Sequence, residues 1–234
     1  MYKRIILKLS GEALSGEKKG KPYDDEVISK IIYQIKYLIE KDIEIGIVVG
    51  GGNLWRGRDS SPDMDRTKSD QIGMLATIMN GVYLADSLKR SGINSVVQTP
   101  IKVGTVSEEF SKDSALSHMK NKTVVIFSGG IGHPFFSTDT VTALRGAELD
   151  VDMLFFAKSI DGVYDDDPKK NPNAKKMDKI ACFDIIKNNL QIIDIAAANL
   201  CFEQKIPVLL FALNQENSII RAFNGENIGT IITV

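Results

Sequence analysis

The sequence alternates between strand patterns and helix patterns from one end to the other. The strand patterns are short apolar runs rich in β-branched residues, and the helix patterns repeat apolar residues every three or four positions. Strands are predicted at Arg4–Leu9, Ile43–Val49, Val96–Thr99, Thr123–Phe127, Val151–Ala157, Val208–Leu213 and Thr230–Thr233. Helices are predicted at Asp24–Lys41, Ser69–Arg90, Thr138–Leu149, Asp194–Gln204 and Ser218–Phe223.

This alternation predicts an α/β fold, a three-layer α/β/α sandwich around a mostly parallel sheet. A length of 234 residues suits one large domain, residues 1–234, and 43% apolar residues can supply its core. We expect the long helix to turn its apolar residues toward a core: Ile72, Leu75, Met79, Val82 and Leu88. The polar loop Lys158–Lys176 is long for a structureless connection, and such loops are often functional.

Composition excludes several classes of protein. Lys and Arg number 29 against 30 Asp and Glu, so the basic excess of a nucleic-acid binder is missing. No apolar run is long enough to cross a membrane, and the start is too short for a secretory signal, so we expect a cytoplasmic protein. Cys182 and Cys201 are predicted to be buried thiols in a reducing compartment. With His118 and His133 as the only histidines, a structural zinc site is not expected.

Three of the predicted strands end in small, flexible residues: Ser10-Gly11, Gly50-Gly51-Gly52 and Ser128-Gly129-Gly130. Ligands bind at the carboxyl ends of strands in open α/β sheets, and glycine there lets backbone N–H groups approach an anion. One such turn alone is more often a tight strand–helix connection. Three turns near candidate cations indicate phosphate binding, although the Walker, dinucleotide and protein-kinase motifs are absent from the sequence.

The candidate cations are Lys8, inside the first strand, and Arg56 and Arg58, after the glycine triplet. Burying an unpaired ammonium is costly, so Lys8 either serves an anion or points outward from an edge strand. The planar guanidinium of Arg56 suits phosphate oxygens, although surface arginines are common. Asp70 and Asp139 lie near predicted helix starts, where each could instead be an N-cap.

Seven motifs carry a resemblance to a known family: KLSGEAL, VVGGGNLWRG, GMLATIMNG, GHPFFSTDT, ALRGAE, DGVYDDDP and DIAAANLC, in that order. The chain resembles the bacterial uridylate (UMP) kinase branch of the amino-acid kinase family from Lys3 to Thr233. The resemblance implies transfer of the γ-phosphoryl group of Mg·ATP to UMP, giving UDP and ADP for pyrimidine nucleotide and CTP biosynthesis. It also implies a homohexamer, with UTP as a candidate feedback inhibitor.

The resemblance assigns both nucleotide sites, but no metal ligand. The residues it places around ATP are Lys8, Leu9, Ser10 and Gly11 under the phosphates, Gly52 and Arg56 on the phosphates, and Lys158, Tyr164 and Asp167 along the base and ribose. The residues it places around UMP are Gly51, Asp70 on the ribose, and the wrapping segment Ile131, Gly132, His133, Pro134, Phe135, Phe136, Ser137 and Thr138.

Phosphoryl transfer to a phosphate needs positioning and charge neutralisation, and no general base, because the acceptor oxygen is already ionised. We expect Lys8 to be the main transition-state cation and Arg56 to clamp the phosphates. Asp139 is expected to orient these cations or the metal. Asp194 either does similar work or caps its helix.

The sequence departs from the family pattern in three places. Ile131 replaces a residue that carries a hydroxyl, so a contact there must come from backbone. Gly20–Asp24 replaces the GFGID pattern that the family ties to GTP activation, so we expect little or no activation by GTP. The segment Ala157–Asp161 falls where the family varies.

Two alternatives stay open. The first is another amino-acid kinase, acting on a carboxylate or carbamate; GHPFFSTDT together with Asp70 favours the UMP branch. The second is a non-catalytic nucleotide-binding protein on this fold, which would be expected to lose Lys8 or Arg56.

Overall fold

The computed structural model describes residues 2–16, 21–57, 61–166, 168, 170–188, 190 and 192–234. Its centre is a nine-stranded sheet in the order β4-β3-β5-β2-β1-β6-β10-β11-β9, in which only the β10–β11 pair is antiparallel. The strands of this sheet are β1 (Arg4–Leu9), β2 (Glu44–Val49), β3 (Ser95–Thr99), β4 (Glu108–Glu109), β5 (Val124–Phe127), β6 (Met153–Lys158), β9 (Lys179–Ala181), β10 (Val208–Ala212) and β11 (Gly229–Thr233).

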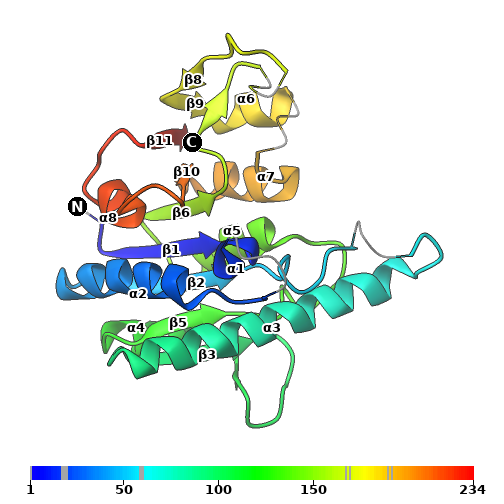
Figure 1. The fold of residues 1–234 in the computed structure, drawn as a ribbon, viewed down its shortest axis with the longest axis vertical. Helices are drawn as coiled ribbons and strands as arrows, with labels where there is room; N and C mark the ends of the chain where they lie inside the picture. The colour runs from blue at the N-terminus through cyan, green and yellow to red at the C-terminus, as the bar shows by residue number, and fades with distance from the viewer. Residues whose placement is uncertain are drawn as a thin grey trace.

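Helices cover both faces of this sheet (Figure 1). They are α1 (Glu12–Ser15), α2 (Asp25–Glu40), α3 (Arg66–Arg90), α4 (Lys112–Lys120), α5 (Thr138–Glu148), α6 (Cys182–Lys187), α7 (Ile195–Gln204) and α8 (Ser218–Phe223). The predicted α/β sandwich around a mostly parallel sheet is confirmed. Within the described residues, no helix is both long and apolar enough to cross a membrane.

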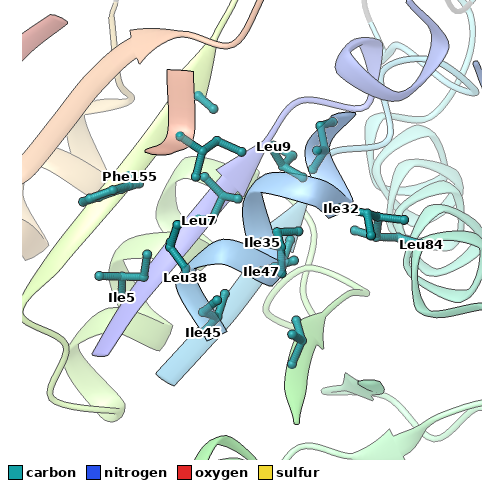
Figure 2. Close-up of a cluster of buried hydrophobic side chains, with 14 of the residues drawn as sticks. Ile5, Leu7, Leu9, Ile32, Ile35, Leu38, Ile45, Ile47, Leu84 and Phe155 are labelled. Carbon is teal, nitrogen blue, oxygen red and sulfur yellow. The ribbon is translucent and has the colours of Figure 1, made fainter. Parts of the chain in front are cut away.

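Strand β1 shows how the pleat divides the core into two clusters. Successive side chains of a strand point to opposite faces. Ile5, Leu7 and Leu9 pack with residues of α2, α3 and α8, as the close-up in Figure 2 shows in part. Ile6 packs on the other face with residues of α4, α5, α6 and α7. Lys8 shares the parity of Ile6, so its side chain lies on the side of α5.

The predicted core face of the long helix is wrong. Helix α3 begins at Arg66, where Asp65 caps it by accepting from the backbone N of Lys68 at 3.0 Å. Of the five apolar residues expected to face the core, Leu88 is buried and Ile72 is half-buried, whereas Leu75, Met79 and Val82 are exposed. The buried face instead includes small and polar residues, among them Ala76, Thr77, Asn80 and Gly81. Small side chains let this helix approach the glycine turns closely.

Several short elements lie outside the predicted ones. The loop Lys158–Lys176 contains strand β7 (Val163–Tyr164), which pairs antiparallel with β8 (Lys176–Met177). The short elements α1, α4, α6, β4 and β9 were not predicted either. The strand predicted at Val151–Ala157 is β6, shifted toward the carboxyl end. Cys182 and Cys201 are buried free thiols, as predicted.

Candidate functional site

The three glycine turns lie together at the carboxyl ends of neighbouring strands in the middle of the sheet. Strands β5, β2 and β1 are parallel neighbours, so the turns that follow them lie side by side. The backbone N of Gly50 donates to Leu9 O at 2.9 Å. A Cβ atom on Gly11 would come within 2.6 Å of the backbone N of Gly52, so only glycine lets these two turns approach this closely. The arrangement gathers backbone N–H groups at one place, as phosphate binding requires.

Lys8 and Lys158 both contact the carboxylate of Asp139. Lys8 Nζ lies 3.0 Å from Oδ1 and Lys158 Nζ lies 2.8 Å from Oδ2. Lys158 Nζ also donates to the backbone O of Ile192. Lys8 therefore faces inward, and the outward-facing alternative is excluded. Two ammonium groups therefore share one carboxylate at the end of β1 and β6.

Burial and charge act against each other in this cluster. Burial acts to raise the pKa of Asp139, but Lys8 and Lys158 outweigh it and hold that pKa below the ordinary carboxyl value. Burial, together with the neighbouring Lys8, lowers the pKa of Lys158 even though Asp139 opposes the shift. The carboxylate of Asp194 also acts to raise the pKa of Lys158, and an incoming phosphate would add further negative charge beside the two lysines.

Arg56 is held beside the glycine turn by two partners. Its Nε donates to Gly52 O at 2.9 Å, and its Nη2 lies 2.7 Å from Oε1 of Glu12. Glu12 belongs to α1, which directly follows Ser10-Gly11, so Arg56 bridges the turns after β1 and β2. Glu12 was missed in the sequence, although it lies within the KLSGEAL motif. Arg58 lies outside the described residues.

Asp70 and the segment Ile131–Thr138 come together, although they are far apart in sequence. The backbone N of Phe135 donates to Oδ2 of Asp70 at 2.9 Å, and Nε of Arg66 lies 3.1 Å from both carboxylate oxygens. The Arg66 guanidinium also lies 5.7 Å from the centre of the Phe135 ring. Asp65, not Asp70, caps α3, so the N-cap alternative for Asp70 is excluded.

Two helix caps are joined at the other end of this segment. The hydroxyl of Ser137 accepts from the backbone N of Asp139 at 3.0 Å and so caps α5. The same hydroxyl donates to Asp194, which caps α7 by accepting from the backbone N of Ala197 at 2.7 Å. Asp139 is therefore not the cap of its helix, whereas Asp194 is the cap of its own. Asp194 also accepts from the hydroxyl of Thr140 at 3.0 Å.

The remaining predicted residues lie at varied depths. The side chain of Leu9 is fully buried in the core, so only its backbone can meet a ligand. Phe135 and Phe136 are exposed. Tyr164 lies on strand β7, and its hydroxyl donates to Asp161 at 2.9 Å. The ammonium of Lys158 contacts the carboxylate of Asp139. Asp167 lies outside the described residues.

Helix α3 supplies contacts that the sequence analysis missed. The hydroxyl of Thr77 accepts from the backbone N of Gly129 at 2.8 Å, which fixes the turn after β5. Asn80 bonds to Gly50 and Asn53 and so fixes the turn after β2. Both residues lie within the motif GMLATIMNG. The spacing of Leu75, Met79 and Val82 indicated another face of the helix, so no local signal pointed to these two contacts.

Across the described residues, no three or more His, Cys, Asp or Glu side chains are grouped so that they could hold a metal ion. Both oxygens of Asp139 already face ammonium groups. Mg²⁺ in kinases is bound through one or two carboxylates together with substrate phosphates. This donor set therefore fits a magnesium ion that arrives on the phosphates of a nucleotide.

Comparison with known proteins gives consistent matches over the chain. The model of the amino acid kinase family matches residues 3–212. The crystal structure of UMP kinase from Bacillus anthracis superimposes with a TM-score of 0.95 at 34% sequence identity, covering 99% of this chain and 96% of that one. The UMP kinase from Ureaplasma parvum superimposes with a TM-score of 0.94 at 35% identity, covering 100% of both chains.

Proposed function

The chain belongs to the amino acid kinase family, and from that premise we propose that it transfers the γ-phosphoryl group of Mg·ATP to UMP, giving UDP and ADP. The observation that carries the proposal is the pair of lysines on Asp139, beside the three glycine turns. Similarity to two UMP kinases along the whole chain supports UMP as the acceptor.

On the donor side, the chain meets the main demand of phosphoryl transfer, which is to hold two polyanions together. Lys8 and Lys158 present cations at the ends of adjacent strands, oriented by Asp139. Arg56 lies within reach of the Gly52 turn and can exchange Glu12 for a phosphate oxygen. Magnesium bound to ATP would neutralise further charge on the phosphates. We infer that Lys8 contacts the transferring group, because it lies at the end of β1 beside the Ser10-Gly11 turn that is expected to lie under the ATP phosphates.

On the acceptor side, Asp70 and the segment Ile131–Thr138 are proposed to bind UMP. The contact between Phe135 N and Asp70 places the segment against the acid that is expected to bind the ribose. A carboxylate can accept from both ribose hydroxyls, since each of its oxygens has two lone pairs. Ile131 offers only backbone to the nucleotide.

We also propose that the chain is a single domain over residues 1–234 that assembles into the homohexamer implied by the resemblance. One nine-stranded sheet runs through the described residues, with only the β7–β8 pair outside it, and this supports the single domain. Leu75, Met79 and Val82 form an exposed apolar stripe on α3, at the spacing of one helix face. A second copy that covers this stripe would remove it from water. Sedimentation of the wild type and of Met79→Glu tests this contact, since the variant should form smaller assemblies.

A single assay tests the activity against both alternatives. Purified protein is given Mg·ATP with UMP, CMP, aspartate or glutamate, and ADP formation is coupled to NADH oxidation. We expect turnover with UMP and little with the other acceptors. Turnover with a carboxylate acceptor would indicate the other branch of the family, and no turnover with any acceptor would indicate a binding protein. The expected cytoplasmic location and inhibition by UTP belong to the same proposal, and adding UTP to the assay tests the latter.

A further inference from the structure

The side chain of Asn80 lies fully buried on α3 and is bonded at both ends of its amide. Its Nδ2 donates to Gly50 O and to Oδ1 of Asn53, each at 2.7 Å, and its Oδ1 accepts from Nδ2 of Asn53 at 3.2 Å. A carbonyl oxygen only accepts, so the amide nitrogen must face Gly50. Burying an amide is unfavourable unless its bonds are made, and here they are made to the glycine turn.

Asn53 extends the same network to two more segments. Its Nδ2 also donates to Pro22 O at 2.8 Å, so all four N–H groups of the two amides have partners. A Cβ atom on Gly11 would lie 2.5 Å from Oδ1 of Asn53, which places this side chain directly against the turn after β1. The asparagine pair therefore connects α3 with the turn after β1, the turn after β2 and the segment that leads into α2.

Helix α3 holds the acceptor side as well. Asp70 lies on the same helix, and its carboxylate accepts from the backbone N of Phe135. One helix thus carries Asp70, which is bonded to the segment proposed to bind UMP, and Asn80, which is bonded to the turn that is expected to hold ATP phosphates. The distance between these two contacts along the helix sets where donor and acceptor meet.

We propose that Asn80, paired with Asn53, is a positioning residue for phosphoryl transfer, and that it fixes the Gly50–Gly52 turn relative to the bound acceptor. The inference rests on the proposed function, in which this turn binds ATP phosphates. A small misplacement of reacting groups lowers the rate of the chemical step more than it weakens binding. Loss of the asparagine pair should therefore lower kcat more than it raises either KM.

The chain provides a spectroscopic probe of this turn. Trp55 is the only tryptophan, its backbone N donates to Gly51 O at 2.9 Å, and its indole N–H donates to Ser69 of α3 at 3.2 Å. Its fluorescence therefore reports the position of the turn relative to the helix. The test compares Asn80→Asp, which keeps the shape but cannot donate to Gly50 O, with Asn53→Ala, whose site is only half-buried. The matched control is Ser87→Ala, a buried polar residue of α3 that bonds within the helix, to Tyr83 O.

For both asparagine variants we expect kcat to fall at least tenfold, each KM to change less than threefold, and Trp55 emission to shift. Ser87→Ala should resemble wild type in all three. The proposal is overturned if the asparagine variants keep kcat within twofold, or if Ser87→Ala loses as much. If Asn80→Asp does not fold, as judged by circular dichroism, Asn53→Ala alone decides. If wild type does not phosphorylate UMP, the proposed function is wrong, and Trp55 emission titrated with Mg·ATP then decides: identical curves for wild type and Asn53→Ala overturn the positioning role.

Discussion

Lys8 and Lys158 approach opposite oxygens of one carboxylate, that of Asp139, from the neighbouring parallel strands β1 and β6. Each lysine taken alone would form a common, partly buried ion pair with an aspartate. Together they place two positive charges beside one shared carboxylate, where three glycine turns present backbone N–H groups. This relationship is the basis of the first two predictions.

Replacing Lys8 by alanine should keep the fold and lower kcat by about 100-fold or more. The side chain is proposed to contact charge that spreads over the transferring group, and losing one such contact costs about 3 kcal/mol. Steady-state kinetics with UMP and Mg·ATP, with circular dichroism as the check on folding, measures this. A folded variant with near-normal turnover would remove Lys8 from its proposed role.

Replacing Asp139 by asparagine should lower stability near neutral pH by about 3 kcal/mol, because two buried ammonium groups lose their counter-charge. The pH dependence follows from the lowered pKa of Asp139 in the folded protein. A carboxyl with a folded pKa below its unfolded value stabilises above the unfolded value, about 4, and loses this contribution as pH falls through the folded pKa.

Urea unfolding measured at several pH values tests this expectation. The wild type should lose stability as pH falls below about 4, and Asp139→Asn should lose less over the same range. Glu226→Gln, which breaks the exposed ion pair with Arg221, is the control and should cost less than about 1 kcal/mol. Parallel curves for wild type and Asp139→Asn would show that the two lysines do not depend on this carboxylate.

Replacing Asp70 by asparagine should raise KM for UMP by about tenfold, with a smaller effect on KM for ATP, because the amide offers one accepting oxygen in place of two. The matched control on the same helix is Asp86→Asn, which breaks the pair with Arg90 at the same i,i+4 spacing as Arg66–Asp70. A rise in KM for ATP alone would contradict the assignment of Asp70 to the acceptor site.

GTP should activate the reaction little or not at all. The segment Gly20–Asp24 differs from the family pattern, and its residues Pro22 and Tyr23 already have protein partners. Pro22 O accepts from Asn53, and the ring of Tyr23 stacks on Tyr83 with centroids 3.7 Å apart. Gly20 and the lysines before it lie outside the described residues. Initial rates at sub-saturating ATP, with and without GTP, measure the effect, and a saturable increase would contradict it.

Local pattern was enough to predict the long elements of this chain. Strand β1 has the predicted limits, and β2 and α2 lie within one residue of theirs, because continuous apolar runs and helical spacing are properties of neighbouring residues. The exposed face of α3 could not be predicted in this way. Leu75 and Met79 follow the same spacing as core residues, and only the position of the sheet shows that Ala76 and Asn80 face inward.

By itself, the sequence determined that buried strands end in glycine turns and that cations lie near them, since both are local features of the chain. Only the tertiary structure decided that Lys8, Asp139 and Lys158 meet, that Asp70 receives Phe135, and that Asn80 holds Gly50. Those contacts depend on the strand order β5-β2-β1-β6 and on the side of the sheet that each helix covers. Strand order depends on how all the elements together bury their apolar surface, so it cannot be predicted from the periodicity of any single segment.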